Sequence, residues 1–290
     1  MLGVAACGPP PRVTQEVAWP TLDPDPPVEY GTVGLANLRR AAGAASIDLE
    51  LGGDGSSMIS SPGCSPATSR VIHTDGTIYL AKGCFRCTLA LVDEVGHGAA
   101  DSLELPLRSI AAALGGYPKS FLDAARVTTI ALCRKLVDDG DPALAEEVAG
   151  TVDQRARRLL VSVSSGNVHR ATVTFHHELF HLFDYSISPN NNHQNDAQWE
   201  ALNPAGFRYL GKSGDVGPGF VDDYAKTSAS EDKASVFHYI MAHTDEFCAR
   251  AVDDPVLMAK GRLIRSRIER AIPVADAAFV TRRARCLAGK

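Results

Sequence analysis

The second half of the chain alternates between helical and extended patterns of apolar residues. Over residues 103–114, Leu and Ile side chains recur near the helical period, and Gly115-Gly116 ends the pattern. Runs of apolar and β-branched residues at 127–132 and 157–164 are typical of strands. We therefore expect helices over 103–114, 142–149, 168–185, 228–243 and 255–272, with strands over 127–132 and 157–164.

The preceding stretch, residues 31–103, has a different pattern. It is rich in Gly and Ser and holds several short β-branched runs. Two of these runs, at 70–73 and 77–80, flank Asp75-Gly76, a pair that suits the type I′ turn of a hairpin. We expect a small β-rich region here, and its sequence does not reveal a function.

Residues 1–30 differ from both parts. Seven prolines crowd into this short segment, which predicts an extended tether that does not pack. Val4-Ala5-Ala6-Cys7-Gly8 resembles the lipobox of bacterial lipoproteins, in which the Cys is lipidated, although the charged and apolar segments of a signal peptide do not precede it. We expect an exported lipoprotein of the cell envelope, attached to a membrane through a lipid at Cys7.

The cysteines support the same compartment. With Cys7 set aside, six of the seven remain: Cys64, Cys84, Cys87, Cys133, Cys248 and Cys286. An exported protein meets an oxidising environment, so up to three disulfides are expected, and fifteen sets of pairings are open. A redox role for Cys84 and Cys87, or free buried thiols, are the alternatives. A zinc ribbon would need a second close pair, which the sequence lacks.

Composition and charge exclude several classes of protein. The 290 residues carry a formal net charge of −5 and are 45% hydrophobic, which suits a globular chain of one or two domains. This charge argues against a binder of nucleic acid, which needs clustered Lys and Arg. No apolar run reaches the roughly 18 residues that a membrane-spanning helix needs.

The helix expected over 168–185 carries His177, Glu178 and His181 in the pattern HExxH. Residues four apart share a helix face, so both imidazoles can reach one metal ion. Glu178 stands one position round the helix, where it can contact a water on that ion without being a ligand. Zn²⁺ with three protein ligands lowers the pKa of its water to about 7, and the carboxylate takes the proton as the water attacks a carbonyl. His176 cannot share this face and is expected to pack or to support the site from behind.

A third ligand must come from another part of the chain. In a metzincin it would be a His six residues after the second ligand, where this chain has Ile187. In the gluzincin arrangement it is a Glu on a later helix. Glu231 falls in the first turns of the helix that Ser228 or Ser230 would cap, and a helix N-terminus favours a carboxylate. The other candidates are Glu200, Asp222, Asp223, Asp232 and His193.

Several stretches around the HExxH helix carry a wider pattern: HHELFHLFD at 176–184, Trp199, Asn203-Pro204-Ala205-Gly206-Phe207, Gly219-Phe220, 224–228 and 231–237. On these residues, the chain from about 104 to 271 resembles a bacterial family of zinc-binding metallopeptidases that are often lipoproteins, and more distantly the catalytic domain of anthrax lethal factor. The resemblance implies a zincin-like fold, Glu231 as the third ligand, and Tyr224, seven residues earlier, as a phenol beside the metal. Such a phenol would donate a hydrogen bond to the developing oxyanion or to the leaving amine.

The chain departs from this pattern at one position. Related sites have a second acid four residues after the ligand Glu, which helps to orient a ligand His, and here that position is Ser235. Asp232, Asp184 or a backbone carbonyl would have to replace it. Trp199 is expected to pack against the helix pair. The strand at 158–164 is either an edge strand that pairs with extended substrate, as in zincin folds, or an ordinary strand of the sheet.

The sequence thus predicts an α+β protein: a tether at 1–30, a β-rich region at 31–103 and a zincin-like domain at 104–290. The expected function is peptide-bond hydrolysis with one Zn²⁺ per chain, which implies a peptide or protein substrate, no nucleic acid, and membrane contact only through Cys7. The alternative is a non-catalytic binding lipoprotein of the surface or periplasm that keeps the fold, with or without the zinc. The metal ligands would be His177, His181 and Glu231, and the catalytic residues Glu178 and Tyr224.

Overall fold

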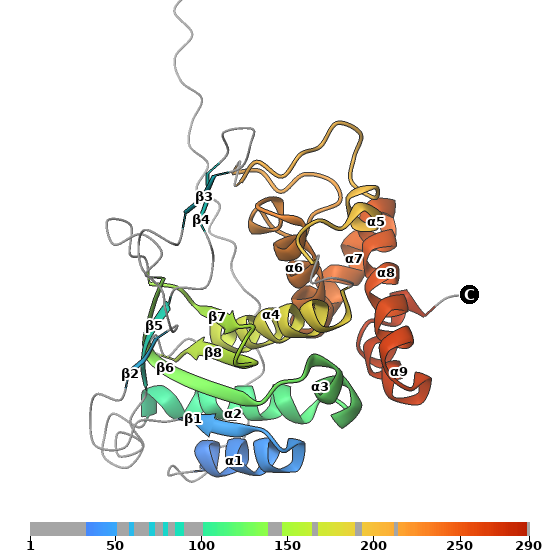
Figure 1. The fold of residues 1–290 in the computed structure, drawn as a ribbon. Helices are drawn as coiled ribbons and strands as arrows, with labels where there is room; N and C mark the ends of the chain where they lie inside the picture. The colour runs from blue at the N-terminus through green and yellow to red at the C-terminus, as the bar shows by residue number, and fades with distance from the viewer. Residues whose placement is uncertain are drawn as a thin grey trace, which may run out of the picture. The chain divides into compact units, whose positions relative to one another are not determined.

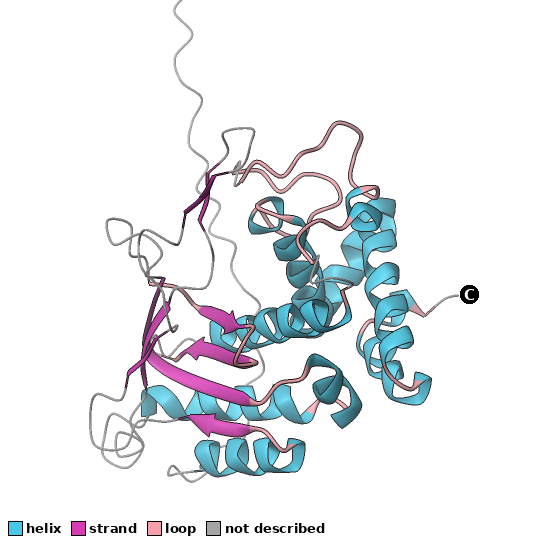
Figure 2. Cartoon of the chain, viewed as in Figure 1, coloured by secondary structure: helices cyan, strands magenta, loops and turns pink. Residues whose placement is uncertain are grey.

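The computed structural model has an α+β fold, in which the strands precede helix α4 and the described chain beyond α4 is helix and loop (Figures 1 and 2). The residues that the structure describes are 33–50, 58–60, 70–72, 78–80, 85–89, 101–138, 147–163, 168–188, 193–211 and 214–288. The expected tether and Cys7 lie outside these residues.

A mixed sheet with strand order β2-β5-β6-β8-β7 forms one part of the fold, and β1 pairs with β6 beside this path. β6 is parallel to β1 and β8 and antiparallel to β5, and β7 is antiparallel to β8. The strands are β1 (Asp48–Glu50), β2 (Met58–Ser60), β5 (Phe85–Leu89), β6 (Thr129–Asp138), β7 (Gly150–Asp153) and β8 (Arg158–Ser162).

β6 is buried on both faces. Ile130 and Leu132 belong to the main core, while Ala131 and Cys133 belong to a smaller core on the other face, as the two-residue period of a strand requires. The expected strands at 127–132 and 157–164 are therefore confirmed, although β6 runs further than expected. β8 lies between β6 and β7, so the interpretation of 158–164 as an edge strand is wrong, and β7 takes that position at the end of the described sheet.

The region 31–103 contains its expected strands and one helix that was not expected. β3 (Arg70–Ile72) and β4 (Ile78–Leu80) pair antiparallel, as the hairpin pattern predicts, and the turn between them lies outside the described residues. Helix α1 (Val33–Ala45) buries Leu38 and Ala42 and packs against α2 (Asp101–Gly115). β1, β2 and β5 of this region join the same sheet as β6 and β8.

Most of the expected helices are present, and one is not. The short helix expected over 142–149 is wrong where the structure describes it: Glu147 bridges to Val137 as extended chain, and the rest lies outside the described residues. The helices and 3₁₀ turns after α2 are α3 (Lys119–Ala125), α4 (Val168–Ile187), α5 (Ala197–Glu200), η3 (Tyr224–Lys226), α6 (Ala229–Ala242), α7 (Thr244–Asp253), α8 (Pro255–Ala271), α9 (Val274–Arg283) and η4 (Arg285–Leu287).

Aromatic side chains join α3, α4 and α6 into one core. Phe183 of α4 stacks on Phe121 of α3 with ring centroids 4.5 Å apart, and Phe180 of α4 stacks on Phe237 of α6 at 4.6 Å. Helix α6 is buried along its whole length from Ala229 to Met241. Its polar residues must therefore find partners inside the protein, because an unpaired buried polar group is costly.

Two disulfides lie within the described residues. Cys87–Cys133 joins β5 to β6, and Cys248–Cys286 joins α7 to η4. The expected pairing of cysteines is confirmed for these four, while Cys64 and Cys84 lie outside the described residues. None of the described helices is both long enough and apolar enough to cross a membrane.

Candidate metal centre

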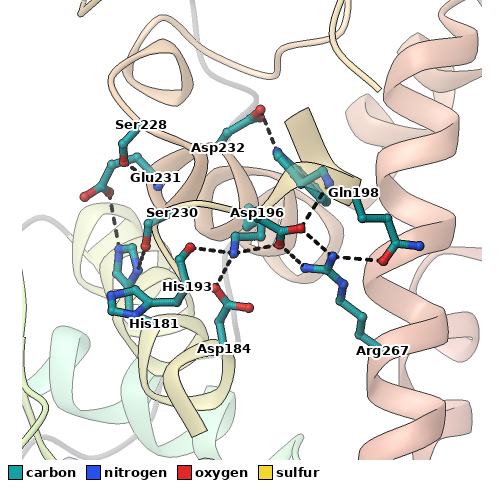
Figure 3. A network of polar contacts seen from close by, with 12 residues as sticks. His181, Asp184, His193, Asp196, Gln198, Ser228, Ser230, Glu231, Asp232 and Arg267 are labelled. Atoms are coloured by element: carbon teal, nitrogen blue, oxygen red, sulfur yellow. Dashed lines mark hydrogen bonds and ion pairs between the residues drawn. The ribbon is translucent and has the colours of Figure 1, made fainter. Parts of the chain in front are cut away.

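The three expected ligands meet at the contact between α4 and α6. His177 and His181 lie one turn apart on α4, and Glu231 lies in the first turn of α6, where its backbone N–H donates to the Ser228 Oγ cap. Glu231 Oε2 is 2.9 Å from His177 Nε2 and 3.3 Å from His181 Nε2, and the two Nε2 atoms are 3.1 Å apart. Figure 3 shows His181 and Glu231 facing each other from the two helices.

The donor set fits a metal ion. All three side chains are buried, and no other group of three or more His, Cys, Asp or Glu with this convergence occurs in the described chain. Ligand atoms around a tetrahedral ion at 2.0–2.1 Å are about 3.3 Å apart, close to the three distances found here. Glu200, Asp222, Asp223, Asp232 and His193 are not part of this group, so Glu231 alone of the sequence candidates joins the two histidines.

Glu178 is buried on α4 beside the two histidines. Its side chain lies against β7 at Gly150, where a Cβ atom would collide with Thr174 Cγ2 and stand 2.8 Å from Glu178 Cγ. The absence of a side chain at position 150 therefore lets the strand approach the helix closely at the carboxylate. The side chain of Glu178 thus packs against the terminal strand of the described sheet.

Tyr224 lies near the ligand pair, on the turn η3. Its ring centroid is 5.9 Å from that of His177, and the residue is 38% exposed. Asp222 Oδ1 accepts a hydrogen bond of 2.7 Å from Ala225 N and so holds the turn. The phenol thus stands at the edge of the site, reachable from solvent.

Each ligand histidine has a partner at its other ring nitrogen. His181 Nδ1 lies 3.1 Å from Ser230 Oγ, and His177 Nδ1 lies 3.2 Å from His238 Nδ1. Burial holds the pKa of His238 well below its usual value, and positive charge on His177 would lower it further. His238 therefore remains a neutral imidazole.

Asp232 and Asp184 do not take the place of the missing acid at Ser235. Asp232 Oδ2 accepts hydrogen bonds from Trp199 Nε1 at 2.9 Å, from Tyr209 at 2.8 Å and from Lys260 Nζ at 2.7 Å. Trp199 is fully buried in this cluster, which confirms that it packs among the helices. The expectation that Asp232 or Asp184 orients a ligand histidine is wrong, because strong donors on other helices compete for both carboxylates.

Asp184 belongs to a second buried cluster around Lys233. Lys233 Nζ lies 2.6 Å from Asp184 Oδ2 and 3.1 Å from Asp196 Oδ2, and it donates to the His193 carbonyl at 2.8 Å (Figure 3). Arg267 forms a bidentate ion pair with Asp196, in which Nη1 donates to Oδ2 and Nη2 donates to Oδ1. A cavity of about 600 Å³ opens beside this cluster, and the metal ligands do not line it.

His176 points away from the ligands, as its helical position predicts. Its Nδ1 is 2.5 Å from the Tyr117 hydroxyl, within the aromatic core. Burial lowers the pKa of His176 to about 3, with further lowering from the Arg283 charge, so it is neutral. It packs in the fold and does not contact the ligand atoms.

Sequence reasoning missed His238 and the two buried lysines, and it considered Ser230 only as a helix cap, a role that Ser228 takes. His238 follows Glu231 by seven residues, two turns further along the same helix face, and this spacing was a usable signal. No comparable signal marks Lys233 and Lys260, whose patterns suit a solvated helix face. No family model, curated protein or solved structure matched the chain. The resemblance described above therefore rests on its motif residues.

Proposed function

We propose that the chain is a zinc-dependent metallopeptidase of the gluzincin type, with a zincin-like fold. The observation that carries the proposal is the convergence of His177, His181 and Glu231 from two helices, with Glu178 buried beside them. Two imidazoles and a carboxylate are the ligands of catalytic zinc sites that keep one position open for water.

The side chains divide the chemistry between them. Zinc bound here would supply a water of lowered pKa and an electrophile for the substrate carbonyl. Glu178 would accept the proton of the attacking water and return it to the leaving amine. The Tyr224 phenol would donate a hydrogen bond to the oxyanion or to the leaving amine, in keeping with its place beside His177.

The substrate would be a peptide in extended form. β7 ends the described sheet and touches Glu178 at Gly150. A peptide that added to this strand would pass beside the carboxylate and the ligand pair. Export is part of the proposal: disulfides persist in oxidising compartments, and lipidation at Cys7 would attach the protein to a membrane.

Metal analysis and a peptide-library digest test this proposal together. The wild-type chain should hold about one zinc, and His177→Ala should lose it. Glu178→Ala should keep the zinc but cleave at least about 100-fold more slowly, because it removes the general base. Glu200→Ala, which removes an exposed Glu on α5, is the matched control and should change neither quantity.

The outcomes separate the two candidate functions. Absence of zinc from the wild-type chain would overturn the proposal. Zinc without cleavage of any library peptide would instead favour a non-catalytic binding lipoprotein, the candidate that Ser235 in place of an acid supports.

A further inference from the structure

His238 connects the ligand pair to the turn that carries Tyr224. It stands on α6, is buried, and its Nδ1 is 3.2 Å from His177 Nδ1. On its other side, Nε2 lies 3.9 Å from Asp222 Oδ2. The same carboxylate holds η3 through Ala225 N at 2.7 Å.

The positions of the protons follow from the geometry. His177 Nε2 faces Glu231 and His181, so it must be unprotonated to bind a metal, and Nδ1 then carries the hydrogen. That hydrogen points at His238 Nδ1, which must accept it and is therefore bare. With Nδ1 as the acceptor, the ring hydrogen of His238 stands on Nε2 and points toward the Asp222 carboxylate.

We infer that His238, supported by Asp222, is the positioning residue for the metal ligand His177. Histidines that bind metals usually donate their second N–H to a carboxylate, a backbone carbonyl or water, which fixes the ring and its tautomer. Here the His238 imidazole accepts that hydrogen, and the Asp222 carboxylate stands one step further away. The inference rests on the proposed metal site and assigns to it a residue outside its ligand set and its general base.

Ser235 does not provide this support. Its buried hydroxyl lies instead beside Asp222, where burial raises the pKa of the carboxyl and a hydrogen bond from Ser235 opposes that rise. The position four residues after Glu231 thus meets Asp222, while the position seven residues after it contacts the ligand His177. Because Ser235 touches the supporting acid, Glu200→Ala at an exposed position on α5 is the suitable control.

The test uses two substitutions of similar size at one position. Asn places its side-chain oxygen where His238 Nδ1 stands, while Leu fills the same space without an acceptor. Zinc affinity, measured by competition with a chromophoric chelator, should fall about 10–100-fold in His238→Leu. It should stay close to the wild-type value in His238→Asn and in Glu200→Ala. Asp222→Ala should weaken binding less than His238→Leu, because it acts one step further from the ligand.

Two results would overturn the inference. One is wild-type affinity in His238→Leu, and the other is equal weakening in His238→Asn and His238→Leu, which would assign the effect to packing. Circular dichroism and thermal unfolding of the metal-free variants identify any variant that fails to fold, and Asp222→Ala then supplies the comparison. A wild-type chain that binds no zinc would refute the proposed function. Zinc affinity that does not depend on a hydrogen-bond acceptor at position 238 would refute this inference alone.

Discussion

At the scale of residues, a fully buried ion pair joins Lys260 to Asp232, the neighbour of the ligand Glu231. Lys260 has no exposed surface, and neither does its partner Asp232. The pair is stabilised by two neutral donors on the carboxylate and by the Gly219 carbonyl, which accepts from Lys260 Nζ at 2.7 Å. Loss of one partner from such a pair leaves a buried charge without compensation.

Asp232→Asn keeps the volume of the side chain but removes its charge. We expect the free energy of unfolding to fall by about 3–5 kcal/mol, measured by urea denaturation. Lys119→Ala is the control, because it breaks the exposed pair with Asp123 and should cost at most about 0.5 kcal/mol. Equal losses in the two variants would contradict the account of a desolvated pair.

The sequence predicted the ligand residues but not the residues behind them. HExxH works as a local signal because helix geometry alone brings His177 and His181 together. The prediction of Glu231 as the third ligand used its place in the first turns of a helix with an expected Ser cap. It also used the resemblance to the metallopeptidase family, including the seven-residue spacing from Tyr224. His238, Lys233 and Lys260 acquire their roles from partners on other helices, and a single sequence does not show which distant residues those will be.

At the scale of elements, the close contact of β7 with α4 decides where Glu178 stands. Glycine is the only residue type that fits at position 150 without movement of the strand or the helix, because a Cβ there would meet both Thr174 and Glu178. The strand and the helix must separate, or the carboxylate must move, if position 150 gains a methyl group.

Gly150→Ala should therefore lower peptide cleavage more than it lowers zinc content, because the added methyl group meets the side chain of Glu178, which is not a ligand. We expect a loss of about 100-fold in kcat/KM, as a displacement near 1 Å can cause. Gly43→Ala in α1 is the control: nothing lies within 4 Å of the added atom, and the change should stabilise that helix by about 0.5–1 kcal/mol. Unchanged cleavage by Gly150→Ala would refute the role of this contact.

The elements themselves were predictable where their pattern was local and regular. α2, α4, α6 and α8 follow from helical periodicity and their caps, within a few residues. The segment at 142–149 has helical composition, yet its described end pairs with β6, because a partner strand outweighs weak local preference. α1 was missed inside a stretch that its Gly and Ser content made resemble loops and strands.

At the scale of the whole molecule, the proposed metal would tie together two distant segments. His181 and Glu231 are 50 residues apart in sequence, on helices that otherwise meet through aromatic packing. A ligand that binds only the folded state adds stability by mass action.

Zinc should therefore raise the thermal midpoint of the metal-free chain. At a hundred times the dissociation constant the gain is about 2.7 kcal/mol, which for a chain of this size is roughly 5–10 °C. In Glu231→Ala the zinc-dependent rise, measured by scanning calorimetry, should largely vanish whatever the starting midpoint. An equal rise in the variant would place the metal elsewhere.

The assembly of the sheet was beyond the reach of the sequence. β1 and β5 pair with successive parts of β6, with partners such as Asp48 and Thr129 about 80 residues apart. Local patterns predict where strands lie but not which strands pair. The α+β class could therefore be predicted from the sequence, whereas the strand order could not.

The two lysines without exposed surface also provide a chemical probe of local unfolding. An amine-acylating reagent reaches the exposed Lys119 and Lys135 in the folded chain, but reaches Lys233 and Lys260 only in molecules that have opened. Lys233 follows Glu231 by two residues on α6. Its acylation rate, measured by mass spectrometry, therefore reports how often α6, the helix that carries Glu231, opens to solvent.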